Sequence, residues 1–119
     1  MTRDPPPIRG EIYLVGPAVP GAEPLPWLVI QHDALSVHAP SVVVAGLSPL
    51  AQRAGFPLTL RLEPADTGLT ETVWAKLTQI HTASRHRLGR PLGRVAPASM
   101  ADLDRALAKV LALDPPRYD

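Results

Sequence analysis

A chain of 119 residues, of which 45% are hydrophobic, suffices for one compact domain with a single core. It has no cysteine, which excludes disulfides and thiolate metal sites, and no apolar run approaches the roughly 20 residues of a membrane span. The net charge of +1 says little about partners, and the composition fits a cytoplasmic protein. Residues 1–8, rich in proline and without an apolar signal segment, are expected to form a flexible N-terminal arm of a single domain over 1–119.

Short apolar runs separated by proline, glycine and polar residues predict a series of β-strands. In the run LTLRL, alternation predicts that Leu58, Leu60 and Leu62 face the core while Thr59 and Arg61 face solvent. The expected strands are Gly10–Val15, Trp27–Gln31, Val42–Leu47, Leu58–Leu62, Val73–Ile80 and Arg90–Val95.

The C-terminal segment changes to a helical period, with one apolar stripe formed by Met100, Leu103, Leu107, Val110 and Leu111. Just after Pro97, Ser99 and Asp102 resemble a capping pair for this helix. Several strands followed by one helix predict an α+β fold. We expect a twisted antiparallel sheet or a small barrel, with the C-terminal helix against it.

Positive charge is concentrated in the second half of the chain, because no acidic residue occurs between Glu71 and Asp102. Such a segment attracts a phosphate backbone, although a solvated basic face explains the same pattern. Its basic residues are Lys76, Arg85, Arg87, Arg90 and Arg94, with His81 and His86 beside them.

The common catalytic motifs are absent: no P-loop, no dinucleotide fingerprint and no HExxH. The four histidines lack the spacing of a zinc site, so no metal is expected. Ser48, in GLSPL, lacks the second glycine of a nucleophile elbow. A serine at a strand end followed by Pro49 is either a plain turn residue or a functional residue carried by a loop.

The order of the segments nevertheless resembles one protein family. RGEIYLV at Arg9–Val15, PWLVIQHD at Pro26–Asp33 and VVVAGLS at Val42–Ser48 are similar to the first three strands of MazF/PemK/Kid-type toxins of type II toxin–antitoxin systems. TQIHT at Thr78–Thr82 and LGRV at Leu92–Val95 resemble the closing strands. The resemblance extends over residues 9–113, the expected toxin-like core.

The resemblance implies an SH3-like fold of the Kid/CcdB type in a two-fold homodimer. It also implies a metal-independent endoribonuclease without cofactor that cuts single-stranded RNA, such as mRNA, at short sequences and arrests growth. A small MazE-like antitoxin would occupy the RNA groove. The C-terminal helix and residues 49–56 are the candidates for the dimer contact, although the helix stripe can equally be used against its own sheet.

At the level of single residues, Ser48 occupies the Thr/Ser position of the family, whereas Leu25 stands where a catalytic arginine is usual. Thr78 replaces an acidic residue and His81 an arginine. We therefore expect Ser48 and His81 as the catalytic residues, because an imidazole serves as acid or base without metal. For His81, an ordinary exposed histidine at a strand end is the alternative. The expected RNA-binding residues are Glu23, Gln52, Arg53, Gln79, Arg85 and Arg87, although Arg87 can also have a structural role.

Two other functions stay open on the sequence alone. The loss of positive charge at Leu25 favours a catalytically degenerate relative that binds RNA, an antitoxin or a protein target without cleavage. A β-rich structural domain without a nucleic-acid role is the other. A comparison of metal-free cleavage of a defined RNA with binding to the same RNA distinguishes the catalytically degenerate relative from an active ribonuclease.

Overall fold

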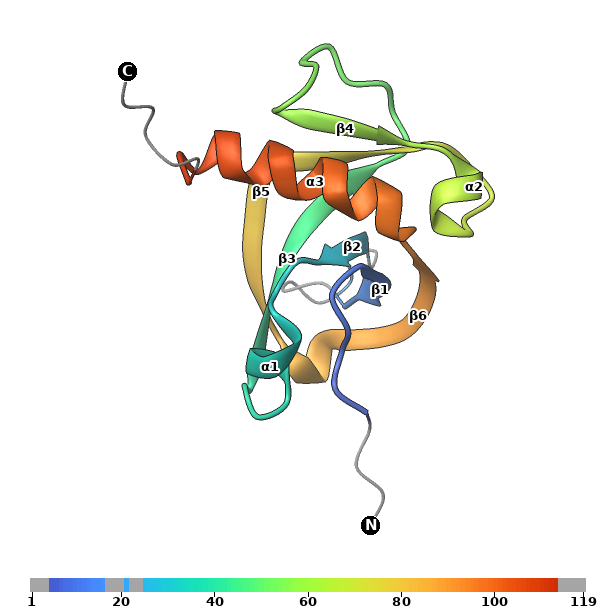
Figure 1. Cartoon of the computed structure of the whole chain (residues 1–119). Coiled ribbons are helices and arrows are strands. Elements are labelled where there is room, and N and C mark those ends of the chain that lie inside the picture. The colour runs from blue at the N-terminus through green and yellow to red at the C-terminus, as the bar shows by residue number, and fades with distance from the viewer. Residues whose placement is uncertain (1–4, 17–20, 22–24, 114–119) are drawn as a thin grey trace, which may run out of the picture.

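The computed structural model describes residues 5–16, 21 and 25–113, which form one antiparallel sheet with a C-terminal helix across it (Figure 1). Each predicted strand is present, with shifted ends. In chain order the elements are β1 (Glu11–Val15), β2 (Leu25–Val29), α1 (Asp33–Ser36), β3 (Ser41–Ser48), β4 (Thr59–Leu62), α2 (Pro64–Thr67), β5 (Val73–Ser84), the 3₁₀ turn η1 (Arg85–Arg87), β6 (Leu88–Arg94) and α3 (Pro97–Val110).

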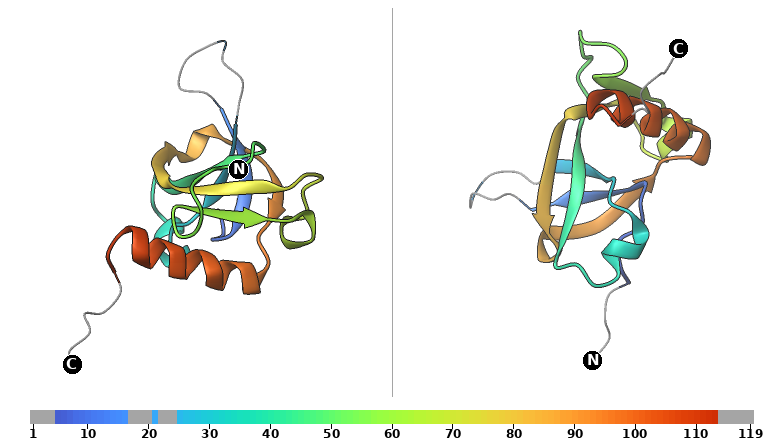
Figure 2. Two further views of the ribbon diagram at one scale, coloured as in Figure 1. Left: turned by 90° about the horizontal axis from the view of Figure 1, so that it is seen from above. Right: turned by 60° about the vertical axis from the view of Figure 1, so that its left-hand side comes forward.

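The six strands lie in the order β4-β5-β3-β2-β1-β6, and every pairing is antiparallel. β4 and β6 are the two edges, so the sheet is open, and it curves strongly (Figures 1 and 2). β5 and β6 follow one another in the chain, yet β3, β2 and β1 lie between them in the sheet. The curvature lets the short turn η1 join them. The predicted α+β fold with a twisted antiparallel sheet is confirmed.

The principal core lies between α3 and one face of the sheet (Figure 2). From α3 it takes most of the predicted stripe, since Leu103, Ala106 and Leu107 are buried while Met100 and Val110 pack at its border. Leu111 of that stripe lies beyond the helix and is 49% exposed. The sheet contributes Ile12, Leu28, Ala45, Leu47, Leu62, Val73, Ala75 and Leu77, and Val95 joins them from the segment before α3.

The opposite side of the sheet, here called the second face, carries a smaller apolar cluster. β3 supplies both sides in alternation: Ala45 and Leu47 point to the principal core, whereas Val42 and Val44 point to the second face. The smaller cluster contains Val15, Val29, Val42, Val44 and Ala83, with Tyr13, Trp27 and Leu88 packed at its border. The aromatic side chains of Tyr13 and Trp27 are therefore packed against the second face of the sheet.

The N-terminus of α3 differs from the prediction. The helix begins at Pro97, its N-cap is Ala96, and no side chain caps it, so the predicted capping pair of Ser99 and Asp102 is wrong. Proline at the first helical position needs no cap for its own missing N–H and has the φ angle of a helix. Asp102 instead forms an ion pair with Arg105, one turn along the helix.

In β4 the predicted inward and outward positions are partly wrong. Thr59 is buried, and its hydroxyl donates a hydrogen bond to the carbonyl of Ala54, whereas Leu58 is 44% exposed. The loop of residues 49–58 folds back toward this edge strand, so a polar side chain is satisfied inside. Arg61 and Leu62 follow the prediction.

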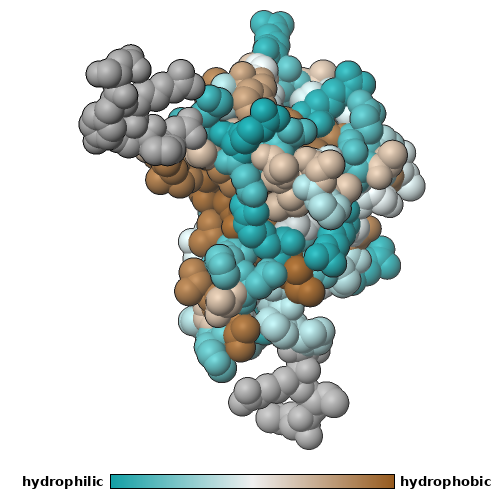
Figure 3. All heavy atoms as spheres, in the orientation of Figure 1, coloured by the Kyte–Doolittle hydropathy of each residue, from teal (hydrophilic) through white to brown (hydrophobic). Residues whose placement is uncertain are grey.

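Apolar side chains also gather on the surface between α1 and the C-terminal end of α3, on the left of Figure 3. A cavity of about 430 Å³ lies there, and Leu35, Leu111 and Leu113 at its rim are exposed. No helix in the described part of the chain is long and apolar enough to cross a membrane.

Candidate functional site

At the centre of the second face, the rings of Trp27 on β2 and His81 on β5 contact each other edge to face. Their centroids are 4.8 Å apart and the ring planes are inclined by 77°. β3 brings the two strands together, because Trp27 pairs with Gly46 and His81 pairs with Val44. The indole therefore packs against one side of the imidazole, while the His81 side chain is otherwise exposed to solvent.

Gly46 makes room for a third member of this group, Gln79. A Cβ atom on Gly46 would stand 2.9 Å from Oε1 of Gln79 and 3.6 Å from the ring of Trp27. The side-chain amide of Gln79 thus lies directly over the backbone of β3. The structure brings together two of the predicted site residues, Gln79 and His81, and adds Trp27 to them.

Ser48 and Gln52 form a second group at the end of β3. The hydroxyl of Ser48 accepts hydrogen bonds from the backbone N–H of Leu50, at 3.1 Å, and from Nε2 of Gln52, at 3.4 Å. Nε2 of Gln52 also donates to the carbonyl of Leu50, at 2.8 Å. This is the turn geometry that a serine at a strand end favours, and it holds both side chains beside the second face.

Leu25 is the neighbour of Ser48 on the adjacent strand. β2 and β3 pair Trp27 with Gly46 and Val29 with Val44, and continuing this register places Leu25 opposite Ser48. The Leu25 side chain is 56% exposed. The position where the family resemblance puts a cation is therefore an uncharged, solvent-facing residue next to the Ser48 hydroxyl.

Ser48 and His81 are not in contact. Val44, the partner of His81, is four residues from Ser48, which is about 13 Å along a strand. Lys76 lies between the two, because it pairs with Gly46. Val73, Ala75 and Leu77 are buried in the principal core, so alternation turns Lys76 to the second face.

Arg85 and Arg87 hold the chain around η1. Arg85 donates from Nη1 to the carbonyl of Ser36 at 2.8 Å. Arg87 donates from Nε and Nη2 to the carbonyl of Gly16, at 2.9 and 2.6 Å. Each guanidinium has five N–H donors, so both have further donors for a ligand beside this structural role. Arg87 therefore has structural contacts in the folded chain.

The remaining predicted residues lie apart from these groups. Arg53 is exposed in the loop of residues 49–58, and Glu23 lies outside the described residues. Within residues 5–16, 21 and 25–113 there is no group of three or more histidine, aspartate or glutamate side chains able to hold a metal ion.

Comparison with known protein families identifies the family to which the chain belongs. Residues 8–111 match the family described as the PemK-like, MazF-like toxin of type II toxin-antitoxin systems. The chain belongs to this family. Two similar curated members are endoribonuclease MazF4 of Mycobacterium tuberculosis and endoribonuclease MazF1 of Mycobacterium bovis. Each is 32% identical over 107 residues, which is 90% of this chain and 94% of the relative.

Solved structures of the MazF-like family have the same fold. An endoribonuclease in complex with its cognate antitoxin, from a mycobacterial species, is 32% identical with a TM-score of 0.76, and covers 92% of this chain and 99% of its own. The Mycobacterium tuberculosis toxin MazF-mt6, 19% identical with a TM-score of 0.74, covers 88% of this chain and 99% of its own, and supports the fold alone.

Two residues of the second face that lie among the candidate residues, Trp27 and Lys76, are not singled out by the sequence. The sequence places Trp27 only in a strand and Lys76 only in a basic segment. Alternation in β5 carried a usable signal for Lys76, because it has the parity opposite to Val73, Ala75 and Leu77. No sequence signal predicts the contact of Trp27 with His81, since this contact depends on β3 lying between their strands.

Proposed function

We propose that this chain is the toxin of a type II toxin–antitoxin system and a metal-independent endoribonuclease that cleaves single-stranded RNA, such as mRNA, at short sequences. The observation that carries the proposal is the match over nearly the whole chain, to the toxin family at residues 8–111 and to relatives named endoribonucleases. The protein would act in the cytoplasm. A small antitoxin would neutralise it, as the antitoxin complex of a 32% identical relative supports.

His81 is the proposed acid–base residue. Metal-free cleavage needs a base that removes the proton of a 2′-hydroxyl, whose oxygen attacks the adjacent phosphorus, and an acid that protonates the leaving 5′-oxygen. An imidazole performs either step near neutral pH. The contact with the Trp27 ring, at 4.8 Å between ring centroids, limits the orientations of the His81 ring. A catalytic group that is already oriented toward the reacting atoms lowers the activation barrier of the reaction.

Lys76 is the proposed cation for the negative charge of the pentavalent transition state. Gly46, its partner on β3, lies two residues from Val44 and two from Ser48, about 7 Å in either direction. A phosphate seated over Gln79 would therefore have His81 on one side and Ser48 on the other. Ser48 is the proposed hydroxyl donor, and Gln52, Arg53, Gln79, Arg85, Arg87 and Glu23 the proposed RNA-binding residues.

A homodimer is part of the proposal, with the loop of residues 49–58 as its contact. The stripe of α3 is buried in the principal core of its own chain, which favours the loop over the helix. Leu50 in this loop is 73% exposed and Phe56 is 47% exposed. Light scattering on the purified protein tests this: Leu50→Asp should shift the mass to that of a monomer, and an unchanged dimer mass would exclude this contact.

The test of the reaction is cleavage of a fluorescent single-stranded RNA in the presence of EDTA. His81→Ala should abolish cleavage, whereas His32→Asn should not, because asparagine can replace the imidazole that caps α1 through Ala34. Full activity in His81→Ala would refute the role of His81. Binding of the RNA by the unmodified protein without cleavage would instead establish the non-catalytic alternative that Leu25 suggests.

A further inference from the structure

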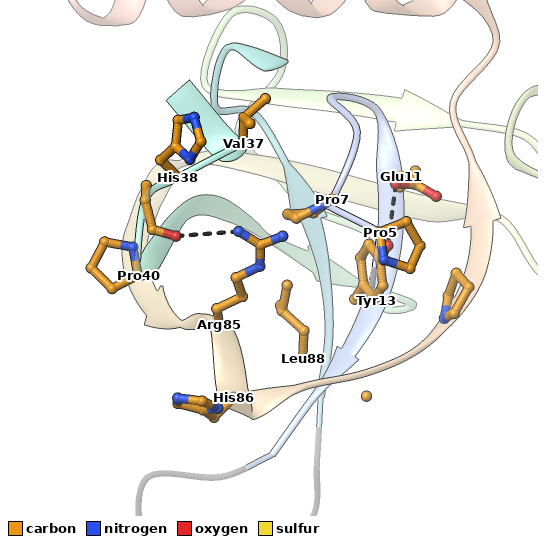
Figure 4. A pocket seen from close by; sticks show the side chains of 13 residues that line it. Pro5, Pro7, Glu11, Tyr13, Val37, His38, Pro40, Arg85, His86 and Leu88 are labelled. Carbon is orange, nitrogen blue, oxygen red and sulfur yellow. Dashed lines mark hydrogen bonds between the residues drawn. The ribbon is translucent and has the colours of Figure 1, made fainter. Parts of the chain in front are cut away.

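A cavity of about 910 Å³ opens at the border of the second face, between β1, β6, η1 and the segment that follows α1 (Figure 4). Its polar groups lie on two opposing walls. Glu11 and Tyr13 come from β1, whereas Arg85 and His86 come from η1, with His38 close by. The volume is within the range of small-molecule sites. A cavity with a cation at one wall and an anion at the other suits a ligand that has both a phosphate and hydrogen-bond donors.

Arg85 is a fixed cation in this cavity. Its Nη1 donates to the carbonyl of Ser36 at 2.8 Å and, more weakly, to that of Ala39 at 3.5 Å, and its backbone N–H donates to Pro40. Figure 4 shows the other terminal nitrogen of the guanidinium turned into the cavity. A guanidinium held on one side, with donors open on the other, is well suited to a phosphate.

Glu11 provides an acceptor on the opposite wall. Its Oε1 accepts hydrogen bonds from the backbone N–H of Ile8 and from the hydroxyl of Tyr13, at 3.2 Å from the latter. Within the described residues, Oε2 has no hydrogen-bond partner. Burial, followed by the charge and hydrogen bond of Glu11, raises the pKa of Tyr13 to about 12, so the phenol stays a donor directed at the carboxylate. Glu11 is thus held in place with one oxygen left for a ligand.

We infer that this cavity binds one nucleotide of the RNA, with a phosphate at Arg85 and, at Glu11, a base that carries an exocyclic amino group. A carboxylate only accepts hydrogen bonds, so it pairs with the amino groups of guanine, adenine or cytosine. Uracil presents two carbonyl oxygens beside its one N–H and is disfavoured. Guanine, with two adjacent N–H donors, suits the carboxylate best. The inference rests on the proposed function, because it assigns a base-selecting subsite to the same RNA.

The position of the cavity agrees with such a subsite. Tyr13 in its wall pairs with Trp27 across β1 and β2, and Trp27 contacts His81. Paired residues on adjacent strands lie only about 5 Å apart. An RNA strand that leaves the proposed reaction centre at His81 therefore crosses Trp27 and reaches the cavity within a nucleotide or two.

The test uses two 2′-O-methyl RNA heptamers, which bind but have no 2′-hydroxyl to react. One is all uridine and the other has a single central guanosine. By fluorescence anisotropy with the full chain, the guanosine heptamer should bind about tenfold more tightly. Glu11→Gln should remove or reverse this preference, because the glutamine oxygen still accepts from Ile8 and Tyr13 while its NH₂ now donates to uracil. Glu71→Gln, in an exposed loop, should keep the preference.

The phosphate contact has its own test. Arg85→Lys should weaken binding of both heptamers by the same factor, since phosphate contacts carry no base information. Arg105→Lys makes the same exchange on α3, where the side chain pairs with Asp102, and should leave binding unchanged.

The outcomes separate this subsite from the proposed function. If the unmodified protein cleaves RNA but binds the two heptamers equally, or if Glu11→Gln keeps the preference, the subsite is wrong and the ribonuclease stands. If neither heptamer binds and no RNA is cut, both are wrong.

Discussion

The rings of Trp27 and His81 meet edge to face at 77°, across a single intervening strand. This contact is the basis of the first prediction. Trp27→Leu keeps an apolar side chain but removes the aromatic partner, and edge contacts between rings are worth about 0.5–1.5 kcal/mol. We expect kcat/KM for RNA cleavage to fall by about two- to tenfold. Trp27→Phe should retain most activity, and equal losses in both variants would contradict an orienting role.

Gly46→Ala is expected to damage the site without unfolding the protein. The new Cβ would meet Oε1 of Gln79 at 2.9 Å, which is the end of a flexible side chain and can move. Cleavage should fall as far as in Gln79→Ala, and the free energy of unfolding should change by less than about 1 kcal/mol. Gly93→Ala is the contrasting variant, because its Cβ would stand 2.3 Å from the backbone oxygen of Thr67.

Urea unfolding of these glycine variants separates the two kinds of loss. Gly93→Ala should lower the free energy of unfolding by several kcal/mol, at the upper end of single substitutions, since backbone cannot move aside as a side chain can. If Gly46→Ala unfolds as easily as Gly93→Ala, the amide of Gln79 is not free to shift.

Tyr13 predicts a change of stability at alkaline pH. Burial and Glu11 raise its pKa from the ordinary 10.0 to about 12 in the folded protein. Below pH 10 the phenol is neutral in both states and its contribution to stability is complete. Between pH 10 and about 12 the unfolded chain releases the proton first, so this contribution is lost as pH rises. Over this pH window, the free energy of unfolding should fall less for Tyr13→Phe than for the unmodified protein. Parallel plots of this free energy against pH would contradict the raised pKa.

The sequence predicted those features that depend on neighbours along the chain. Alternation located the strands, and the 3.6-residue period located α3, because burial on one side leaves a regular trace. The predicted orientations of Leu58 and Thr59 were wrong because a loop folds over the edge strand and its backbone accepts a hydrogen bond from the threonine hydroxyl. The grouping of Trp27, Gln79 and His81 could not be predicted from the residues, since it depends on residues more than 50 positions apart in the sequence meeting on either side of β3.

Lys76→Met tests whether the lysine supplies the charge that Leu25 lacks. Methionine keeps the length and apolar stem while removing the ammonium group, so the fold should be preserved. Removing one transition-state donor costs about 10²–10³ in kcat elsewhere, and we expect a loss of at least tenfold here. Lys109→Met on α3 is the matched control. Unchanged cleavage in Lys76→Met would move the search for the cation to Arg85 and Arg87.

Leu25→Arg is expected to make the enzyme more active. Leu25 is 56% exposed and lies at the register position opposite Ser48, so an arginine side chain can extend into solvent with little effect on stability. Its guanidinium would stand beside the Ser48 hydroxyl and add positive charge where the transition state is negative. Cleavage of the fluorescent RNA should rise by about tenfold or more.

A general gain in affinity for RNA would raise activity too, so the control is Leu35→Arg. This residue is 64% exposed and lies beside the apolar cavity near α3, away from the second face. It adds the same charge to the protein and should leave kcat unchanged. The two variants should also differ when Lys76→Met is added. If Leu25→Arg supplies the missing cation, it should restore cleavage to Lys76→Met, whereas Leu35→Arg should not. Failure of this rescue would mean that the lysine and the restored arginine do not act on the same phosphate.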